Sequence, residues 1–572
     1  MKSNITKADA IILALMMIVY SVIALVNLGD MAAPETFWKN TPGNYITIER
    51  TEEAEIEKLN VYNGIQESED KRYTLIPFGE EEIDKASSFT LESVFCWKSI
   101  KVEAKASWMM IMVGGEKESY IGEIAAYGAG GNRIEIKSVT DHNGKAIPEL
   151  FDEQDVAVYT PSFKNGTYFD EIYHARTAYE YTHGIEAYEW THPPLGKLII
   201  AIGISIFGVN PFGWRIMGTL VGIMMLPIMY VMAKMLFKKT GYAAFACALL
   251  SFDFMHFTQT RIATIDVYAT FFIMLMYLFM YKFYEENYNE TGLKNVFKYL
   301  ALAGLSFGLG AASKWTCIYA GIGLAVIFAV YMVKRYLEYR RGKAENYVKN
   351  TVKILLWCVI FFVILPVGIY ILSYLPYAFV KPYGFTFENI WRIQKNMFDY
   401  HSDLVATHPF SSQWYEWPLM IKPIWYHITR LPEERIMTIS AFGNPAIWWV
   451  GIPAAAIAAY YAITDKKNAQ LPCFILVGYA AQYLPWALIG RVVFIYHYFP
   501  SVPFVILMIT YAVKRIYERA KNKKAVILGA GVYVALVITL FIMFYPAISG
   551  METDHGYVKN VLTWFDGWYI GG

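Results

Sequence analysis

The chain has 572 residues, of which 56% are hydrophobic, 17% aromatic and 17% charged, and its mean hydropathy is +0.31. Soluble domains carry about 25% charged residues, so the composition excludes the roughly four soluble domains that the length alone suggests. Fifty basic against 49 acidic residues give a net charge of +1, which excludes a general binder of nucleic acid, and the five scattered cysteines indicate neither a disulfide framework nor a CxxC metal motif. The composition predicts an α-helical polytopic membrane protein.

The first apolar segment, residues 8–28, follows Lys2 and Lys7 and is long enough to cross a bilayer, which takes about 20 residues. No convincing small-residue cleavage site follows it, so we interpret it as an uncleaved signal anchor with a cytoplasmic N-terminus. Further spans are expected at 213–233, 242–260, 265–284, 297–313, 315–333, 353–374, 444–464, 470–489, 492–513 and 525–547. This layout has about eleven transmembrane helices and places the C-terminal tail outside the cell.

The basic turns follow this layout without exception. Cytoplasmic turns are enriched in Lys and Arg, and in this layout they should follow every even-numbered span. Each of them carries basic residues, at 234–239, 282–298, 334–349, 466–467 and 514–524.

Two long segments, 30–210 and 375–443, are expected on the outer face. Within the first, 85–160 shows short alternating runs separated by glycine turns, which is typical of a small β-sandwich. The pattern becomes helical over 168–188, and 190–208 is expected to be an interfacial helix opened by a His-Pro-Pro sequence.

Three outer turns carry cations where the positive-inside rule expects few. Arg261 accompanies Asp266 after the third span, Lys314 lies between the fifth and sixth, and Arg491 follows the ninth. Ionisable residues at this depth are costly and mark candidate functional sites. Three cations at one level suit a lipid-borne phosphate, although each side chain could instead extend to lipid headgroups.

A pair of adjacent carboxylates, Asp170 and Glu171, precedes the interfacial helix. Neighbouring residues on a helix cannot face the same way, so one carboxylate can enter a site while the other bonds to the scaffold. An acid at the membrane surface could act as general base for a hydroxyl nucleophile. The alternative is a solvated helix start, where acidic residues are favoured by the helix dipole.

Polar and aromatic residues recur at the outer boundary elsewhere. Asp253 and His256 lie near the outer end of the third span, where a buried Asp needs a partner. The loop 401–430 is rich in His and Trp, including Trp417, and forms either an interfacial belt or a wall for stacking sugars. No third ligand accompanies His401 and Asp403, so no metal is assigned.

Several separated motifs resemble the protein O-mannosyltransferases, polyprenyl-phosphate-dependent glycosyltransferases of the GT-C fold. The resemblance covers roughly 165–513 and the anchor. The motifs, in family order, are Phe169-Asp170-Glu171, the HPPLGK sequence at 192–197, NPFGWR at 210–215, Asp253-Phe-Met-His256, TRIATID at 260–266, Ser313-Lys314-Trp315, Trp417-Pro-Leu-Met420, Pro485-Trp486, Arg491 and the HYFP sequence beginning at His497.

This resemblance implies transfer of mannose, with inversion, from polyprenyl-phosphate mannose to a Ser or Thr hydroxyl of an exported protein, without metal or cofactor. Asp170 would be the general base, Glu171 its supporting neighbour, and Arg261 a phosphate ligand. Lys314, Arg491 and His497 are added as donor-phosphate or lipid ligands. The remaining candidates for the donor or acceptor pocket are His192, Asp253, His256, Asp266 and Trp417.

The chain differs from eukaryotic members because no MIR repeats are recognisable after the seventh span. Instead, the first outer segment resembles a discoidin-type, galactose-binding-like sandwich, for example at 97–100 and 121–124. Together these features favour a bacterial plasma-membrane enzyme with an extracytoplasmic active site. The expected units are an anchor (1–29), the β domain (30–165), a catalytic outer loop (166–212), spans 2–7 (213–374), an outer loop (375–443), spans 8–11 (444–547) and an outer tail (548–572).

Two alternative functions remain. A transferase of the same fold could use another lipid-linked sugar or a lipid or cell-wall acceptor. A transporter would also carry charges in its spans, but transporters bind near the midplane and often contain internal repeats, and this chain shows neither. The expected partners are therefore a polyprenyl-phosphate sugar donor, an exported protein or glycan acceptor and the bilayer, without nucleic acid.

Overall fold

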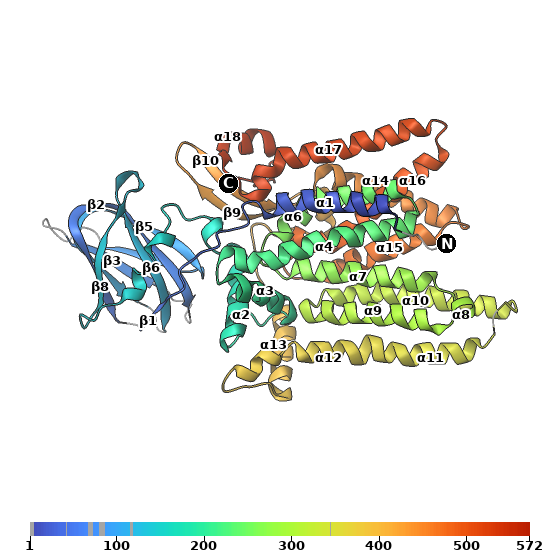
Figure 1. Ribbon diagram of the computed structural model, residues 1–572, viewed down its shortest axis with the longest axis horizontal. Helices are drawn as coiled ribbons and strands as arrows, with labels where there is room; N and C mark the ends of the chain where they lie inside the picture. Colours follow the sequence, from blue (N-terminus) through green and yellow to red (C-terminus); the bar gives the residue numbers. More distant parts are fainter. Residues whose placement is uncertain are drawn as a thin grey trace.

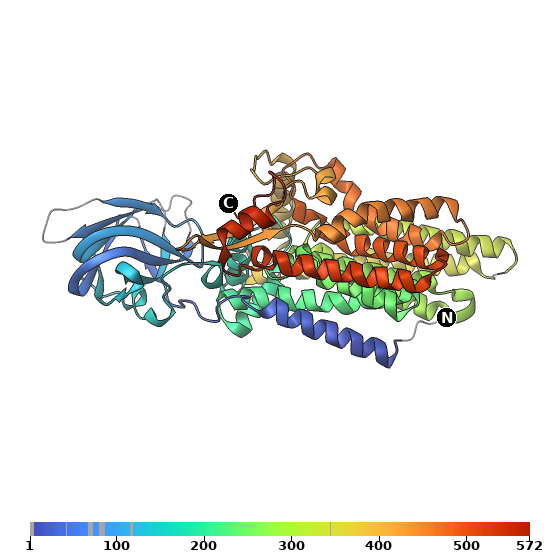
Figure 2. The same cartoon turned by 90° about the horizontal axis from the view of Figure 1, so that it is seen from above.

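The computed structural model describes residues 5–41, 43–66, 72–78, 86–114, 118–343 and 345–571. A β domain lies at one end of a long helical bundle, and both views show the bundle helices running side by side (Figures 1 and 2). The protein is a multi-pass membrane protein, as the composition predicts.

Ten helices within the described ranges are long and apolar enough to cross a membrane. They are α1 (Lys7–Leu25), α4 (Pro211–Phe237), α7 (Asp266–Glu285), α9 (Leu293–Ser313), α10 (Cys317–Arg340), the segment Tyr347–Phe379 with α11 (Tyr347–Val359) and α12 (Leu365–Leu372), α14 (Pro445–Thr464), the segment Gln470–Leu488 with α15 (Gln470–Tyr483), the segment Ile495–Arg519 with α16 (Val502–Arg519), and α17 (Lys523–Ser549).

The predicted continuous span over 242–260 is wrong. This segment forms two short helices, α5 (Thr240–Ser251) and α6 (Phe254–Thr260), and the Asp253 side chain caps the second by accepting a hydrogen bond from the His256 amide. An Asp at an N-cap position favours the beginning of a new helix over continuation of the preceding one. Because α4 and α7 both begin beside Glu171, the broken pair returns the chain to that end of the bundle.

The two ends of the bundle differ in chemistry. At one end, which we call the Asp170 end, the short helices α2 (Glu171–His183), α3 (Leu195–Phe207) and α13 (Phe387–Asp403) gather beside the β domain (Figure 1). At the opposite, lysine-rich end, the basic turns converge: Lys282, Lys334, Lys467 and Lys514 line one cavity. The predicted grouping of the basic turns is therefore confirmed.

The helices α2 and α3 agree with the helical patterns predicted over 168–188 and 190–208. Helix α13 is two-faced: Ile393 and Met397 pack in an apolar cluster, whereas Phe387, Trp391 and Phe398 stay 63–80% exposed. An exposed apolar stripe flanked by charged residues is typical of a helix lying in a membrane interface.

The outer sheet at the Asp170 end is small and joins distant parts of the chain. Strand β10 (Arg435–Ala441) pairs with β9 (Ile424–Arg430) on one side and with β11 (Thr553–Asp554) on the other. The C-terminal segment after α17 therefore packs onto the loop that follows α12, and Trp568 and Ile570 are buried there.

The β domain consists of β1 (Trp38–Asn40), β2 (Tyr45–Gln66), β3 (Arg72–Phe78), β4 (Ser87–Thr90), β5 (Cys96–Val113), β6 (Ser119–Tyr127), β7 (Arg133–Ile134) and β8 (Ile136–Asp141). The order is β1-β6-β2-β5-β3-β4, with β7 on β6 and β8 on β2, and all pairs are antiparallel. Alternate residues of β3 are buried, as expected when one face covers a core. β structure thus begins well before residue 85, and the described strands form one network. The discoidin likeness stays a prediction.

The β domain is joined to the bundle through the turn before β5. The Phe95 ring lies 5.3 Å from that of Tyr179 and 6.2 Å from that of Trp214, and its carbonyl accepts the Thr167 amide. Gly166 is required there, because a Cβ at this position would lie 2.6 Å from the Cys96 Cβ. The domain is thus anchored directly beside the start of α2.

Candidate functional site

The Glu171 carboxylate is completely buried and fully engaged. The Arg215 guanidinium of α4 donates two hydrogen bonds to it, both 2.7 Å long, and the Trp214 indole and the Ala263 amide donate two more. Glu171 and Arg215 are each 0% exposed. A buried pair of this kind is stable only when its remaining groups are also bonded, and here they are. Glu171 therefore ties α2 to α4 and to the segment before α7.

Asp170, the preceding residue, takes part in none of these bonds, and the residue as a whole is partly exposed. Its carboxylate makes no hydrogen bond or ion pair to another described residue, and it lies within electrostatic range of Asp266, Lys314 and Glu189. Burial raises the pKa of Asp170 to about 7, with Asp266 adding to the rise and Lys314 opposing it. A carboxylate with an unused acceptor and a pKa near neutrality meets the requirements of a general base.

The turn before these two carboxylates is strained. Phe169 has φ of 49°, in the left-handed region that non-glycine residues seldom adopt. Its ring stacks on that of Tyr426 at 4.1 Å, which holds the backbone in this conformation. Of the two consecutive carboxylates that follow this turn, Glu171 binds Arg215 and Asp170 does not.

Asp266, the first residue of α7, forms an ion pair with Lys314 at 2.7 Å. Lys314 directly follows α9, and its ammonium lies 5.9 Å from the centre of the Tyr496 ring. Tyr496 is in turn within electrostatic range of Asp170, Asp266 and Arg491. Lys314, Asp266 and Asp170 therefore share one site, although only the first two are in contact.

A second polar cluster lies next to Asp170 and is centred on Glu189. Its carboxylate accepts hydrogen bonds from the Lys197 ammonium and, at 3.0 Å, from the His192 Nδ1. Lys197 also donates to the backbone carbonyls of Glu189 and His192 and thereby closes the loop between α2 and α3. Burial alone would raise the pKa of Glu189, but Lys197 and His192 hold it well below its ordinary value. The His192 imidazole is thus fixed in one orientation at the edge of the site.

His497 closes the opposite side of the site within an aromatic cluster. Its ring lies 4.4 Å from that of Trp486 and 4.5 Å from that of Tyr496, and it stacks on Trp417 at 6.1 Å. His497 Nδ1 binds the Phe494 backbone, and Trp417 is held by Ser412. These contacts leave His497 Nε2 without a bond to another described residue.

Arg491 differs from the other cations predicted for the site because its guanidinium makes no hydrogen bond or ion pair to any residue in the described ranges. It lies within electrostatic range of His497 and His401. It borders a cavity of about 570 Å³ that is also lined by His408, Ser411, Ser412, Gln413 and Glu416. Its five donors are therefore available for an anionic ligand.

Three predicted site residues lie elsewhere. The Arg261 guanidinium is 5% exposed and donates to the carbonyls of Ala24, Val26, Asn27 and Ser549, so the predicted role as phosphate ligand is not favoured. Asp253 accepts from the Asn444 amide and the Trp448 indole. His256 donates to the Gly222 carbonyl. All three are buried among helices and bind backbone or scaffold groups.

Glu189 was not among the predicted site residues. It lies three residues before His192, and the sequence signal is a pair of opposite charges, Glu189 and Lys197, on either side of the His-Pro-Pro sequence. Tyr426 and Tyr496 were also missed, because aromatic residues at a membrane boundary give no signal of their own.

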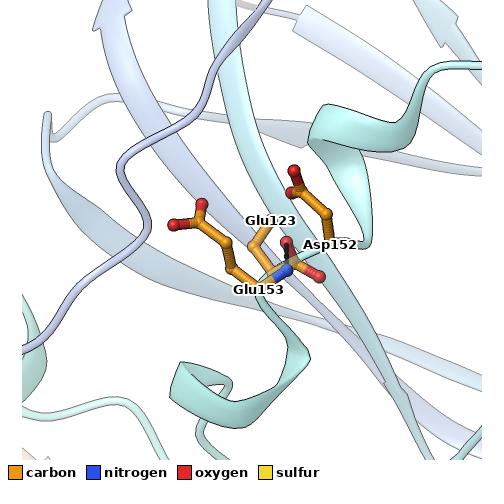
Figure 3. Close-up of side chains that lie close together, drawn as sticks. All are labelled: Glu123, Asp152 and Glu153. Atoms are coloured by element: carbon orange, nitrogen blue, oxygen red, sulfur yellow. Dashed lines mark hydrogen bonds between the residues drawn. The ribbon is translucent and has the colours of Figure 1, made fainter.

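The described residues contain one group of carboxylates with the spacing of a metal site, and it lies in the β domain. Oxygens of Glu123, Asp152 and Glu153 lie within 4.8 Å of one another (Figure 3). Glu153 accepts from the Glu35 and Thr36 amides, and Glu123 accepts from the Glu153 amide and the Gln154 side chain. Burial raises the pKa of Glu123 to about 7. These N–H donors and the raised pKa of Glu123 account for the cluster, so it does not by itself identify a metal site.

Two family models match the chain. Residues 191–370 match "Dolichyl-phosphate-mannose-protein mannosyltransferase", and residues 386–568 match "C-terminal four TMM region of protein-O-mannosyltransferase". Asp170, Glu171 and the β domain precede both ranges, so these two models do not test their roles.

Relatives and a solved structure agree with these models. A Mycobacterium tuberculosis polyprenol-phosphate-mannose–protein mannosyltransferase is 26% identical over an alignment 461 residues long, which covers 70% of this chain and 86% of that protein. A Corynebacterium glutamicum protein of the same name is 25% identical and covers 66% and 81%. The fold resembles the yeast Pmt1–Pmt2 complex bound to the sugar donor, with a TM-score of 0.59, 14% identity, and coverage of 70% of this chain and 89% of that one. Because the two models together cover more than half of the sequence, the chain belongs to the protein O-mannosyltransferase family.

Proposed function

We propose that this protein transfers mannose from a polyprenyl-phosphate-mannose donor to a hydroxyl group of an exported protein at the Asp170 end of the bundle. The names of the relatives support the donor, the sugar and the protein acceptor. The grouping of basic turns at the opposite end supports a plasma-membrane enzyme whose active site faces the extracytoplasmic side.

The observation that carries this proposal is the isolation of the Asp170 carboxylate beside paired and unpaired cations. Asp170 accepts the proton of the acceptor hydroxyl, and the resulting oxygen nucleophile forms a bond to the anomeric carbon. The bond from that carbon to the phosphate oxygen breaks, and its electrons leave with the polyprenyl phosphate. Attack opposite the leaving group inverts the anomeric centre.

The cations hold the charge that develops on the leaving phosphate. Among the described residues, the Arg491 guanidinium has no hydrogen-bond or ion-pair partner, and the Lys314 ammonium forms an ion pair with Asp266 alone. Preorganised donors of this kind stabilise the transition state because they are in place before charge develops. His497 Nε2 and the His192 edge complete a pocket in which Trp417 supplies an aromatic wall.

The test uses the full chain in lipid vesicles with radiolabelled polyprenyl-phosphate mannose and a Ser/Thr-rich peptide. We expect label in the peptide, and none when Ala replaces each Ser and Thr. Polyprenyl-phosphate glucose and a lipid acceptor serve as competitors. Transfer of another sugar, or transfer to lipid in preference to peptide, would refute the assignment of donor or acceptor, respectively.

A further inference from the structure

A large cavity lies at the lysine-rich end of the bundle, opposite the Asp170 site. Its volume is about 850 Å³, and its walls come from α4, α7, α10 and α16 together with the turn between α14 and α15. It is therefore an opening between spanning helices at the level of one membrane surface. The proposed transfer reaction uses none of its residues.

Positive charge predominates in this cavity. Five cations line it, Lys282, Lys334, Lys467, Lys514 and Arg515, against only two carboxylates, Glu285 and Glu286. Glu285 is already paired with Lys238 at 2.7 Å, outside the lining, and Glu286 accepts hydrogen bonds from Thr291 and Asn295. The carboxylates therefore do little to neutralise the lining cations.

Three of the five cations have no acidic partner among the described residues. Lys514 and Arg515 pair with Glu518, and Arg515 also pairs with Asp465. Lys282, Lys334 and Lys467, which line the same cavity, form no ion pair with any residue that the structure describes. The Lys282 and Lys334 ammonium groups lie 5.7 and 5.5 Å from the ring centres of Tyr299 and Tyr284, positions that keep them at the wall.

An unpartnered hydroxyl adds a second, independent observation. Tyr511 lines the same cavity and is only 2% exposed, and its buried hydroxyl has no hydrogen-bond partner in the described chain. The Arg515 Nε is likewise buried and unbonded. Buried polar atoms are normally satisfied, so two orphaned donors beside one cavity indicate an absent acceptor.

Topology alone does not explain this arrangement. The positive-inside rule accounts for basic residues in the turns, but it is satisfied equally by exposed ones such as Lys343, Lys349 and Lys521. Convergence of unpaired ammonium groups and orphaned donors on one cavity between helices is typical of a headgroup or phosphate site.

We propose that this cavity binds a phosphate-bearing anion at the membrane surface opposite the transfer site. Lysine ammonium groups serve as point charges for phosphate oxygens, and the Tyr511 hydroxyl and Arg515 Nε donate the directional hydrogen bonds. The ligand is either the headgroup of an anionic phospholipid or a soluble phosphate, since both present the same oxygens.

The test compares two triple variants with equal loss of charge. The cavity variant is Lys282→Gln/Lys334→Gln/Lys467→Gln, and the matched control is Lys343→Gln/Lys349→Gln/Lys521→Gln, whose residues are exposed at the same end. The thermal midpoint of the full chain is measured in phosphatidylcholine nanodiscs, first with inorganic phosphate and then with increasing phosphatidylglycerol. The concentration dependence yields an apparent Kd for each probe.

We expect the cavity variant to bind at least about tenfold more weakly, while the control stays within about twofold of the parent. A response to phosphatidylglycerol alone identifies a lipid headgroup, and a response to inorganic phosphate identifies a soluble ligand. Equal losses in both variants would show diffuse surface charge and overturn the proposal, as would a parent that responds to neither probe.

Tyr511→Phe provides a second variant that removes one hydroxyl and leaves the ring packing in place. It should weaken the same probe several-fold without lowering the midpoint measured in its absence. Unchanged affinity in this variant would remove Tyr511 from the site. Mannose transfer is measured in parallel and is expected to persist in all variants, so failure of the anion site and failure of the proposed reaction are distinguishable.

Discussion

Charged side chains lie on both sides of the start of α2, but those on one side are bonded to protein groups and those on the other are not. On the scaffold side, Glu171, Arg215 and Arg261 are buried, and all of them are bonded to protein groups. On the other side, the side chains of Asp170 and Arg491 have no hydrogen-bond or ion-pair partner in the described chain. The two groups contain the same residue types at the same membrane depth, so neither property distinguishes a structural charged residue from a functional one. What distinguishes them is whether the side chain is bonded to other protein groups, and four substitutions test this distinction.

The largest effect is expected at Asp170. Asp170→Asn keeps the shape of the side chain but cannot accept a proton, so the single-turnover rate of transfer should fall about 10²- to 10⁴-fold. Donor affinity and thermal midpoint should change little, because the side chain bonds to no described residue. Asp399→Asn is the matched control, because Asp399 is an exposed residue of α13, and this variant should keep the parental rate. A near-normal rate in the Asp170 variant would disprove its role as base.

On the scaffold side, Glu171→Gln should act on stability. It leaves the fully buried Arg215 without its charge partner, a change that typically costs about 3–5 kcal/mol. Chemical denaturation of the vesicle-reconstituted protein measures this loss. Adding Arg215→Met should recover part of it, because the partners interact directly. If Glu171→Gln instead keeps the parental stability and lowers the rate of transfer, Glu171 acts in the reaction and not in the scaffold.

The two arginines sharpen the contrast. Arg491→Ala should weaken binding of the donor lipid by about 1.5–3 kcal/mol, which is roughly 10- to 150-fold, with an unchanged thermal midpoint. Arg261→Ala removes contacts to four carbonyls and should mainly lower the midpoint. Donor affinity and melting are measured for both variants, and an exchange of the two phenotypes would contradict the assignment.

The smallest effects concern pH. Because the base must be ionised and the pKa of Asp170 is raised to about 7, kcat/KM should rise about tenfold per unit below pH 7 and level off above it. A raised carboxyl pKa means that the folded state holds the proton more tightly. Stability from this group is therefore present at low pH and lost as pH rises toward 7. Asp170→Asn should flatten the rate profile and melt slightly higher than the parent at pH 8.

Much of this architecture could be predicted from local sequence. Hydropathy located ten of the spans, basic turns set their alternation, and the order of the motifs identified the family. The break at Asp253 was missed because the apolar segment is long enough to span, and only the capping bond to His256 shows that the helix restarts. Arg261 and Arg491 could not be distinguished, since the partners of Arg261 lie more than 230 residues away at both ends of the chain.

The Arg261 contacts also constrain how the protein is made. One guanidinium binds carbonyls that follow α1 and the carbonyl of Ser549 at the end of α17, which is synthesised after the other long helices described here. Domains fold progressively as synthesis proceeds, but this junction stays incomplete until α17 has been inserted. A chain released before α17 is made therefore leaves the Arg261 Nη1 group without the Ser549 carbonyl as its acceptor.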